Sequence, residues 1–97
     1  METYIILGNW TQQGISKVKE APARIETVRK AFEAAGGKQI AWYLTFGRYD
    51  FVVLAEFPDA RAAASLLLRN GSQGDASTET LRAMTEAEFK AIVATLP

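Results

Sequence analysis

The sequence predicts an α+β domain in which helices cover one face of a four-stranded antiparallel sheet. The chain has 97 residues, enough for one hydrophobic core, so we expect a single domain over residues 1–97. Strand-like and helix-like periodicities follow one another in the order strand, helix, strand, strand, helix, strand, helix. This order fits the split βαβ arrangement of ferredoxin-like folds, βαββαβ, with an extra C-terminal helix.

The first predicted strand covers residues 3–10, where β-branched and aromatic residues occur without a strong breaker. Residues 11–14 then turn the chain. A helix begins at about Pro22, a residue that suits a first helical turn, and ends at Gly36-Gly37. Its apolar face is formed by Ile25, Val28, Phe32 and Ala35.

The second and third strands are predicted over residues 39–46 and 50–57. The short link Gly47-Arg48-Tyr49 contains a glycine, which favours a hairpin. Pro58 ends the third strand, and Asp59 can cap the helix that follows.

The remaining elements are a helix from Ala60 to about Asn70, a strand over 76–84 and a final helix. Gly71 and Gly74 end the first of these helices. Thr85 and Glu88 form a capping box at the start of the last helix. The apolar face of that helix consists of Phe89, Ile92, Val93 and Leu96.

The central strands are apolar on both faces, whereas a sheet with one face in water should alternate apolar and polar residues. On the third strand, Phe51 and Val53 lie on one face, and Val52 and Leu54 lie on the other. Because two helices can cover only one face, a second copy of the chain is the simplest cover for the other. We therefore expect a homodimer or a higher homo-oligomer.

Composition argues against several kinds of function. Eleven basic residues balance eleven acidic ones, so net charge gives no general attraction to nucleic acid or to an anionic membrane. The chain has no histidine and no cysteine, which removes the usual transition-metal ligands and thiol nucleophiles. We expect no metal, cofactor, nucleic-acid or membrane partner. With no basic region before the first apolar run, we expect no signal peptide and a cytoplasmic protein.

The turn Gly47-Arg48-Tyr49-Asp50 resembles the GYD-domain family, a small bacterial and archaeal family named for a glycine, a tyrosine and an aspartate at such a turn. The resemblance runs nearly end to end. Its other segments are residues 4–8, 11–15, 36–37, 49–53 and 78–83. It implies a fold similar to the dimeric α+β barrels, in which two ferredoxin-like sheets pack face to face, and it implies no particular activity.

The turn supplies the first candidate residues. Asp50 can act as a general base or ligand anchor at a pocket rim, or it can accept backbone hydrogen bonds within the turn. Tyr49 can orient a ligand through its hydroxyl, or it can cover the sheet edge. Gly47 is explained by a need for positive φ.

Aromatic residues supply the second group. Trp10 and Trp42 can share one face of the sheet, with Asn9 and Tyr43 beside them. Aromatic rings with a few polar groups are typical of small-molecule pockets, and they are also typical of subunit interfaces. In a barrel-like dimer, we expect the face that carries the tryptophans to line a cavity.

Other polar side chains have ordinary explanations beside functional ones. The strand residues Glu56 and Glu79 can support acid–base chemistry or form surface salt bridges. Lys17 and Lys19 can bind an anion near a helix start, or they can be solvated lysines. The loop Gly71-Ser72-Gln73-Gly74 lacks the lysine and the spacing of a P-loop.

The leading interpretation is a domain that binds a small molecule between the Gly47–Asp50 turn and the second sheet face, the one that the two helices leave uncovered. The candidate ligand-binding residues are Asn9, Trp10, Trp42, Tyr49 and Asp50. One alternative is a cofactor-independent enzyme acting on an aromatic or quinone-like substrate, with Asp50 or Tyr49 handling the proton. Another is a structural or regulatory oligomer without a pocket.

Overall fold

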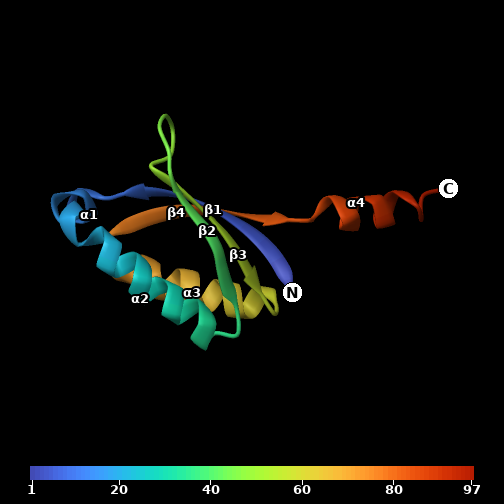
Figure 1. Cartoon of the computed structure of the whole chain (residues 1–97), viewed down its shortest axis with the longest axis horizontal. Helices are drawn as coiled ribbons and strands as arrows, with labels where there is room; N and C mark the ends of the chain where they lie inside the picture. Colours follow the sequence, from blue (N-terminus) through green and yellow to red (C-terminus); the bar gives the residue numbers. More distant parts are fainter.

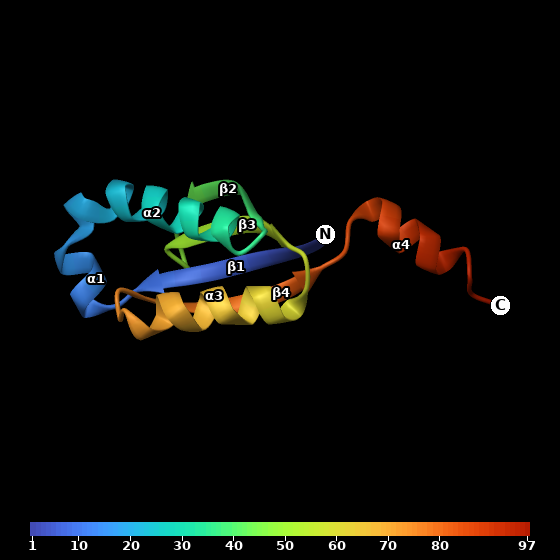
Figure 2. The same cartoon turned by 90° about the horizontal axis from the view of Figure 1, so that it is seen from below.

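The computed structural model describes residues 1–97 and consists of a four-stranded antiparallel sheet with α2 and α3 on one face (Figures 1 and 2). The strand order is β2-β3-β1-β4, so β1 and β3 are central neighbours, and the ferredoxin-like βαββαβ fold with an extra C-terminal helix is confirmed. The elements are β1 (Glu2–Trp10), α1 (Gln12–Ser16), a 3-10 turn (Val18–Glu20), α2 (Ala21–Ala34), β2 (Lys38–Leu44), β3 (Phe51–Phe57), α3 (Ala60–Ser72), β4 (Ala76–Ala83) and α4 (Glu86–Val93). None of the helices is long and apolar enough to span a membrane.

The segment after β1 is the short helix α1, whereas the sequence predicted a simple turn. Thr11 caps this helix by accepting a hydrogen bond from the Gly14 amide at 3.1 Å. A Cβ atom at Gly14 would collide with the backbone of Asp75. Glycine at this position therefore lets α1 pack against the loop that precedes β4.

The connection between β2 and β3 is longer than predicted, because β2 ends at Leu44 and β3 begins at Phe51. The Thr45 amide donates to the Asp50 carbonyl at 2.8 Å and closes the loop. Gly47 has a φ of 93°, which a residue with a side chain rarely adopts. The loop projects from the sheet on the side opposite to α2 and α3 (Figure 1).

The core lies between the sheet and these two helices, on the face that we call the helix-covered face. Phe57, which is fully buried, stacks on Phe32 of α2 with ring centroids 5.1 Å apart. Burying a side chain of this size contributes about 1.5–3 kcal/mol. The other buried members of the cluster are Tyr4, Ile6, Phe51, Val53, Ala55, Ala63 and Leu66.

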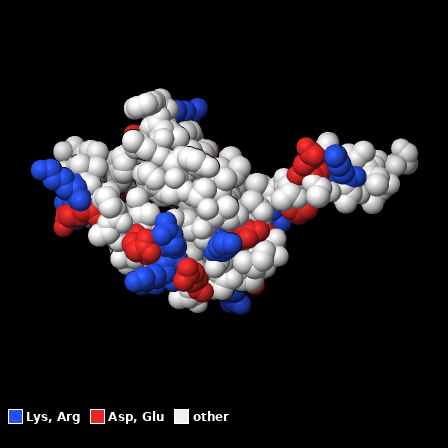
Figure 3. All heavy atoms as spheres, in the orientation of Figure 1, with Lys and Arg blue, Asp and Glu red and all other residues white.

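The opposite face, which we call the open face, is also apolar. The register places Ile5 opposite Leu54 and Leu7 opposite Val52, and these four side chains are half-buried against one another. No helix covers them. In Figure 3, charged side chains gather over the helices and α4 and one basic side chain lies at the tip of the β2–β3 loop, while the surface between the loop and the helices is mostly uncharged. The apolar character of both sheet faces is therefore as the sequence predicted.

The C-terminal helix α4 stands apart from the sheet and the other helices (Figures 1 and 2). Its predicted capping box is confirmed, since Thr85 accepts from the Glu88 amide at 3.1 Å and Glu88 accepts from the Thr85 amide at 3.1 Å. Its apolar stripe is exposed and consists of Phe89, Ile92 and Val93. Leu96, which the sequence predicted on the same helix face, lies beyond the end of the helix at Val93 and is also exposed. In the single chain this stripe is therefore not part of the core.

Candidate functional site

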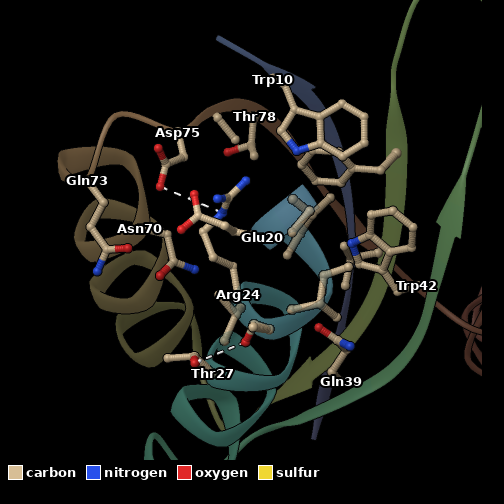
Figure 4. A pocket seen from close by; sticks show the side chains of 18 of the residues that line it. Trp10, Glu20, Arg24, Thr27, Gln39, Trp42, Asn70, Gln73, Asp75 and Thr78 are labelled. Carbon is tan, nitrogen blue, oxygen red and sulfur yellow. Dashed lines mark hydrogen bonds and ion pairs between the residues drawn. The ribbon is translucent and has the colours of Figure 1, made fainter. Parts of the chain in front are cut away.

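A cavity of about 440 Å³ lies between α2 and the helix-covered face of the sheet (Figure 4). Residues of β1, β2 and β3 form one wall, and residues of α2 form another. The end of α3 and the start of β4 close the polar end. This volume lies within the usual range for small-molecule sites.

Three aromatic rings form the apolar wall of the cavity. Phe51 lies between the two tryptophans, with its centroid 5.5 Å from that of Trp10 and 5.6 Å from that of Trp42. The Trp42 and Phe51 rings are nearly parallel, at 16°. A Cβ atom at Gly8 would collide with the Phe51 ring, so glycine there lets the ring lie against β1. The wall therefore presents aromatic faces to a bound molecule.

A β-bulge brings Trp42 to this wall. Gln39 pairs with Ala55 and Trp42 pairs with Val53, although an odd number of positions separates Gln39 from Trp42. Regular alternation would place them on opposite faces, but the register shift between Gln39 and Ala41 places both on the helix-covered face. Gln39 is buried although its side chain is an amide, and it lines the cavity beside Trp42 (Figure 4).

Arg24 of α2 dominates the polar end of the cavity. Its Nη1 donates to the Lys17 carbonyl at 3.3 Å, and its Nε lies 3.8 Å from Oδ2 of Asp75. Its Nη2 is shielded from solvent and has no hydrogen-bond partner in the protein. An unpaired buried donor costs about 1–3 kcal/mol, and more when the group is charged. The structure therefore carries an unsatisfied cationic donor at a small-molecule-sized cavity.

Asp75 holds the polar end together from the loop before β4. Its Oδ1 accepts from Gln13 Nε2 at 2.9 Å and lies 3.2 Å from Lys17 Nζ. The Gln13 hydrogen bond and then the Lys17 ammonium lower the pKa of Asp75 below its ordinary value. The carboxylate is therefore ionised at neutral pH and links α1 to Arg24.

We expect Asp75→Asn to lower the thermal unfolding midpoint at pH 7. Because the pKa of Asp75 is lowered in the folded state, its contribution is fully present above the unfolded pKa of about 4 and is lost as pH falls through the folded pKa. The difference in unfolding midpoint between wild type and Asp75→Asn should therefore become smaller as the pH is lowered below about 4. Calorimetry over a pH series checks this. A difference that grows in acid would contradict it.

Asp50 is held by the backbone of β1. Its Oδ2 accepts from the Trp10 amide at 3.0 Å, and its own amide donates to the Gly8 carbonyl at 2.8 Å and to Asn9 Oδ1 at 3.1 Å. These contacts fasten the β2–β3 loop to the end of β1. They match the structural interpretation of Asp50 as a residue that accepts a backbone hydrogen bond.

We expect Asp50→Ala to lower the free energy of unfolding by about 1–3 kcal/mol, because the Trp10 amide loses its acceptor. Asp50→Asn keeps an acceptor and should cost less. Urea unfolding measures both. If Asp50→Asn instead left stability unchanged and weakened binding of a ligand at least tenfold, Asp50 would be a functional carboxylate.

Tyr49 crosses the open face from the loop to β4. Its hydroxyl donates to Glu79, and this hydrogen bond raises the pKa of Tyr49 above its ordinary value. The Arg48 guanidinium lies 5.9 Å from the centroid of the Tyr49 ring. Since the phenol stays protonated and already donates its proton, it is poorly placed to accept one.

The structure divides the five predicted ligand-binding residues into two groups. Trp10 and Trp42 share a face, as expected, but it is the helix-covered face and not the one left for a second subunit. Asn9, Tyr49 and Asp50 lie at the end of the open face and its loop. The cavities of the chain lie on the helix side, and none lies between the open face and the Gly47–Asp50 turn. The expected placement of the tryptophans at the subunit-facing side is therefore wrong.

Sequence reasoning missed Arg24 as a cavity residue, because only the apolar residues of its helix were assigned to the inner face. Arg24, Val28 and Phe32 lie four positions apart, so they follow one stripe of α2. That spacing is the signal that could have found it. Lys17 pairs with Asp75 and supplies no free anion site, and no group of acidic side chains is placed to hold a metal ion.

Comparisons with known proteins agree on the family and the fold. The family model described as "GYD domain" matches residues 4–93. A relative from Thermus thermophilus is 35% identical over 90 residues, which is 92% of this chain and 95% of that protein. Its name is "Glutamine synthetase and cystathionine beta-lyase binding protein".

Two solved structures show the same fold at low sequence identity. The feast or famine regulatory protein from M. tuberculosis, complexed with L-methionine, matches with a TM-score of 0.66 and 20% identity. The match covers 88% of this chain but 51% of that one, so this chain spans about half of its length. TTHA0845 from Thermus thermophilus matches with a TM-score of 0.55 and 21% identity, over 88% of this chain and 95% of that one.

Proposed function

This chain belongs to the GYD-domain family, and we propose that it is a small-molecule-binding domain that works as a homo-oligomer. The observation that supports binding most strongly is the cavity beside α2, which combines an aromatic wall with the unpartnered Nη2 of Arg24. Both parts are typical of ligand sites, in which a mostly apolar surface carries a few polar groups that orient the ligand.

The proposal moves the ligand from the open face to the helix-covered face. Trp10 and Trp42 remain ligand-binding residues in it, while Asn9, Tyr49 and Asp50 act on the fold around them. The structural match to a regulatory protein complexed with L-methionine supports small amphipathic molecules, apolar amino acids among them, as the first probes to try.

The homo-oligomer is supported by the open face, where Ile5, Leu7, Val52 and Leu54 lack a cover. Contiguous apolar patches of this kind on a small protein mark interaction surfaces. The enzyme alternative has less support, because the Asp50 carboxylate is bound to a backbone amide and the Tyr49 hydroxyl to Glu79.

Intrinsic fluorescence tests the proposed function, because both tryptophans of the chain line the cavity. We expect apolar amino acids or aromatic acids to change the emission in a saturable way. Val28→Phe, which fills the cavity from α2, should abolish the change. The matched control is Val93→Phe on the exposed stripe of α4, which should leave it intact. Responses that are equal in both variants would contradict binding in this cavity.

A further inference from the structure

We infer that the cavity selects a ring-bearing apolar carboxylate, with the carboxylate group bound by Arg24. The inference rests on the proposed small-molecule binding and assigns the ligand's chemical class. Figure 4 shows the two ends that such a molecule would meet: Arg24 beside Asp75 at one, and Trp10 and Trp42 at the other.

The hydrogen bonds that Arg24 makes, and the one that it lacks, indicate which chemical group of a ligand it would bind. Nη1 is used by the Lys17 carbonyl and Nε faces Asp75, so the guanidinium is fixed in position on two sides. Nη2 is left without an acceptor. A guanidinium fixed in this way presents its remaining N–H groups in a planar fork, which matches the oxygens of a carboxylate.

The charges at this end also favour an anionic group. Lys17 and Arg24 share the single carboxylate of Asp75, at 3.2 Å and 3.8 Å. Glu20 lines the same end, but it is exposed and makes no ion pair with either cation. Asp75 is therefore the only carboxylate paired with these two cations, and an anion bound at Arg24 Nη2 would give Arg24 an acceptor that it does not share with Lys17.

The opposite end selects a flat apolar group. Trp42 and Phe51 are nearly parallel, and Trp10 is tilted by 47° against Phe51, so the wall offers ring faces. Aromatic rings stack on such faces in offset or edge-on arrangements. The polar side chains near this end are Gln39 and Thr78, and both are neutral (Figure 4). A second charge on the ligand would find no partner there.

Three probes that differ only in their end group test the inference: 3-phenylpropionate, 3-phenylpropan-1-ol and 3-phenylpropylamine. Tryptophan emission and calorimetry give a Kd for each. We expect the carboxylate to bind wild-type protein at least tenfold more tightly than the alcohol, and the amine to bind most weakly. Arg24→Gln should remove the preference. Arg29→Gln, on the same helix but outside the cavity, should retain it.

The outcomes separate the inference from the proposed function. If the three probes bind equally well and Val28→Phe blocks them all, the cavity binds small molecules and the role of Arg24 is overturned. If none of the probes binds, the inference is overturned. The fluorescence titrations with apolar amino acids and aromatic acids then test the proposed function separately. If Arg24→Gln fails to fold, the affinities of the three probes for wild-type protein still test whether the cavity prefers a carboxylate.

Discussion

Leu54→Glu is expected to convert the proposed homo-oligomer to monomers at micromolar concentration. Leu54 lies on β3, in the middle of the open face and opposite Ile5 of β1. If a second sheet covers this face, the new carboxylate is buried without a partner, which costs several kcal/mol and exceeds what a small interface can offset. Light scattering coupled to size exclusion measures the change in mass.

The matched control is Leu68→Glu on α3, where the leucine is 76% exposed. This variant adds the same charge on the helix side and should remain assembled. A wild-type protein that is monomeric at this concentration would remove the basis of the oligomer proposal. A Leu54→Glu variant that keeps its full mass would place the interface elsewhere on the chain.

Phe51→Ala should lower the free energy of unfolding by about 3–5 kcal/mol. Phe51 is buried between Trp10 and Trp42 and lies over Gly8, so truncation removes its packing against both indoles and against β1. The emission of both tryptophans should shift to longer wavelength as water enters. Urea unfolding and the emission spectrum check the two parts.

Phe89→Ala on α4 removes the same ring from a position that is 60% exposed. Since surface substitutions usually change stability by less than about 0.5 kcal/mol, this variant should unfold almost as the wild type does. Equal losses in Phe51→Ala and Phe89→Ala would mean that the aromatic wall is not part of the core, or that α4 packs on another surface in solution.

The fold could be predicted from local signals that tertiary contacts reinforce. The capping box at Thr85 and Glu88 and the cap at Asp59 are set by side-chain hydrogen bonds within one turn, so the helix starts were correct. The apolar character of both faces of β3 was visible as a continuous apolar run from Phe51 to Ala55, because successive side chains of a strand point to opposite faces. Both kinds of signal depend on residues that are close in sequence.

The parts that were missed depend on contacts between distant residues. The α1 helix is held by the loop before β4, where the Thr11 hydroxyl donates to the Gly74 carbonyl at 2.6 Å. The bulge between Gln39 and Ala41 is defined by pairing with β3, and it decides which face Trp42 joins. Neither partner can be identified from residues 11–16 or 38–44 alone.

The candidate site was found in part for the same reason. Trp10 and Trp42 were recognised as ligand-binding candidates from their residue type, which is a local property. Arg24 becomes significant only because Asp75, 51 positions later, fixes its Nε while Nη2 stays free. The role of Asp50 as a backbone acceptor likewise depends on Trp10, 40 positions earlier.

Nuclear magnetic resonance of the protein titrated with 3-phenylpropionate tests the central claim, the location of the ligand, most directly. The indole N–H signals of Trp10 and Trp42 and the methyl signals of Val28 report on the cavity. Those of Leu7 and Leu54 report on the open face. We predict that the cavity signals shift together and saturate, while the open-face signals stay in place. Shifts of Leu7 and Leu54 with unmoved indole signals would contradict the claim and place the ligand between subunits.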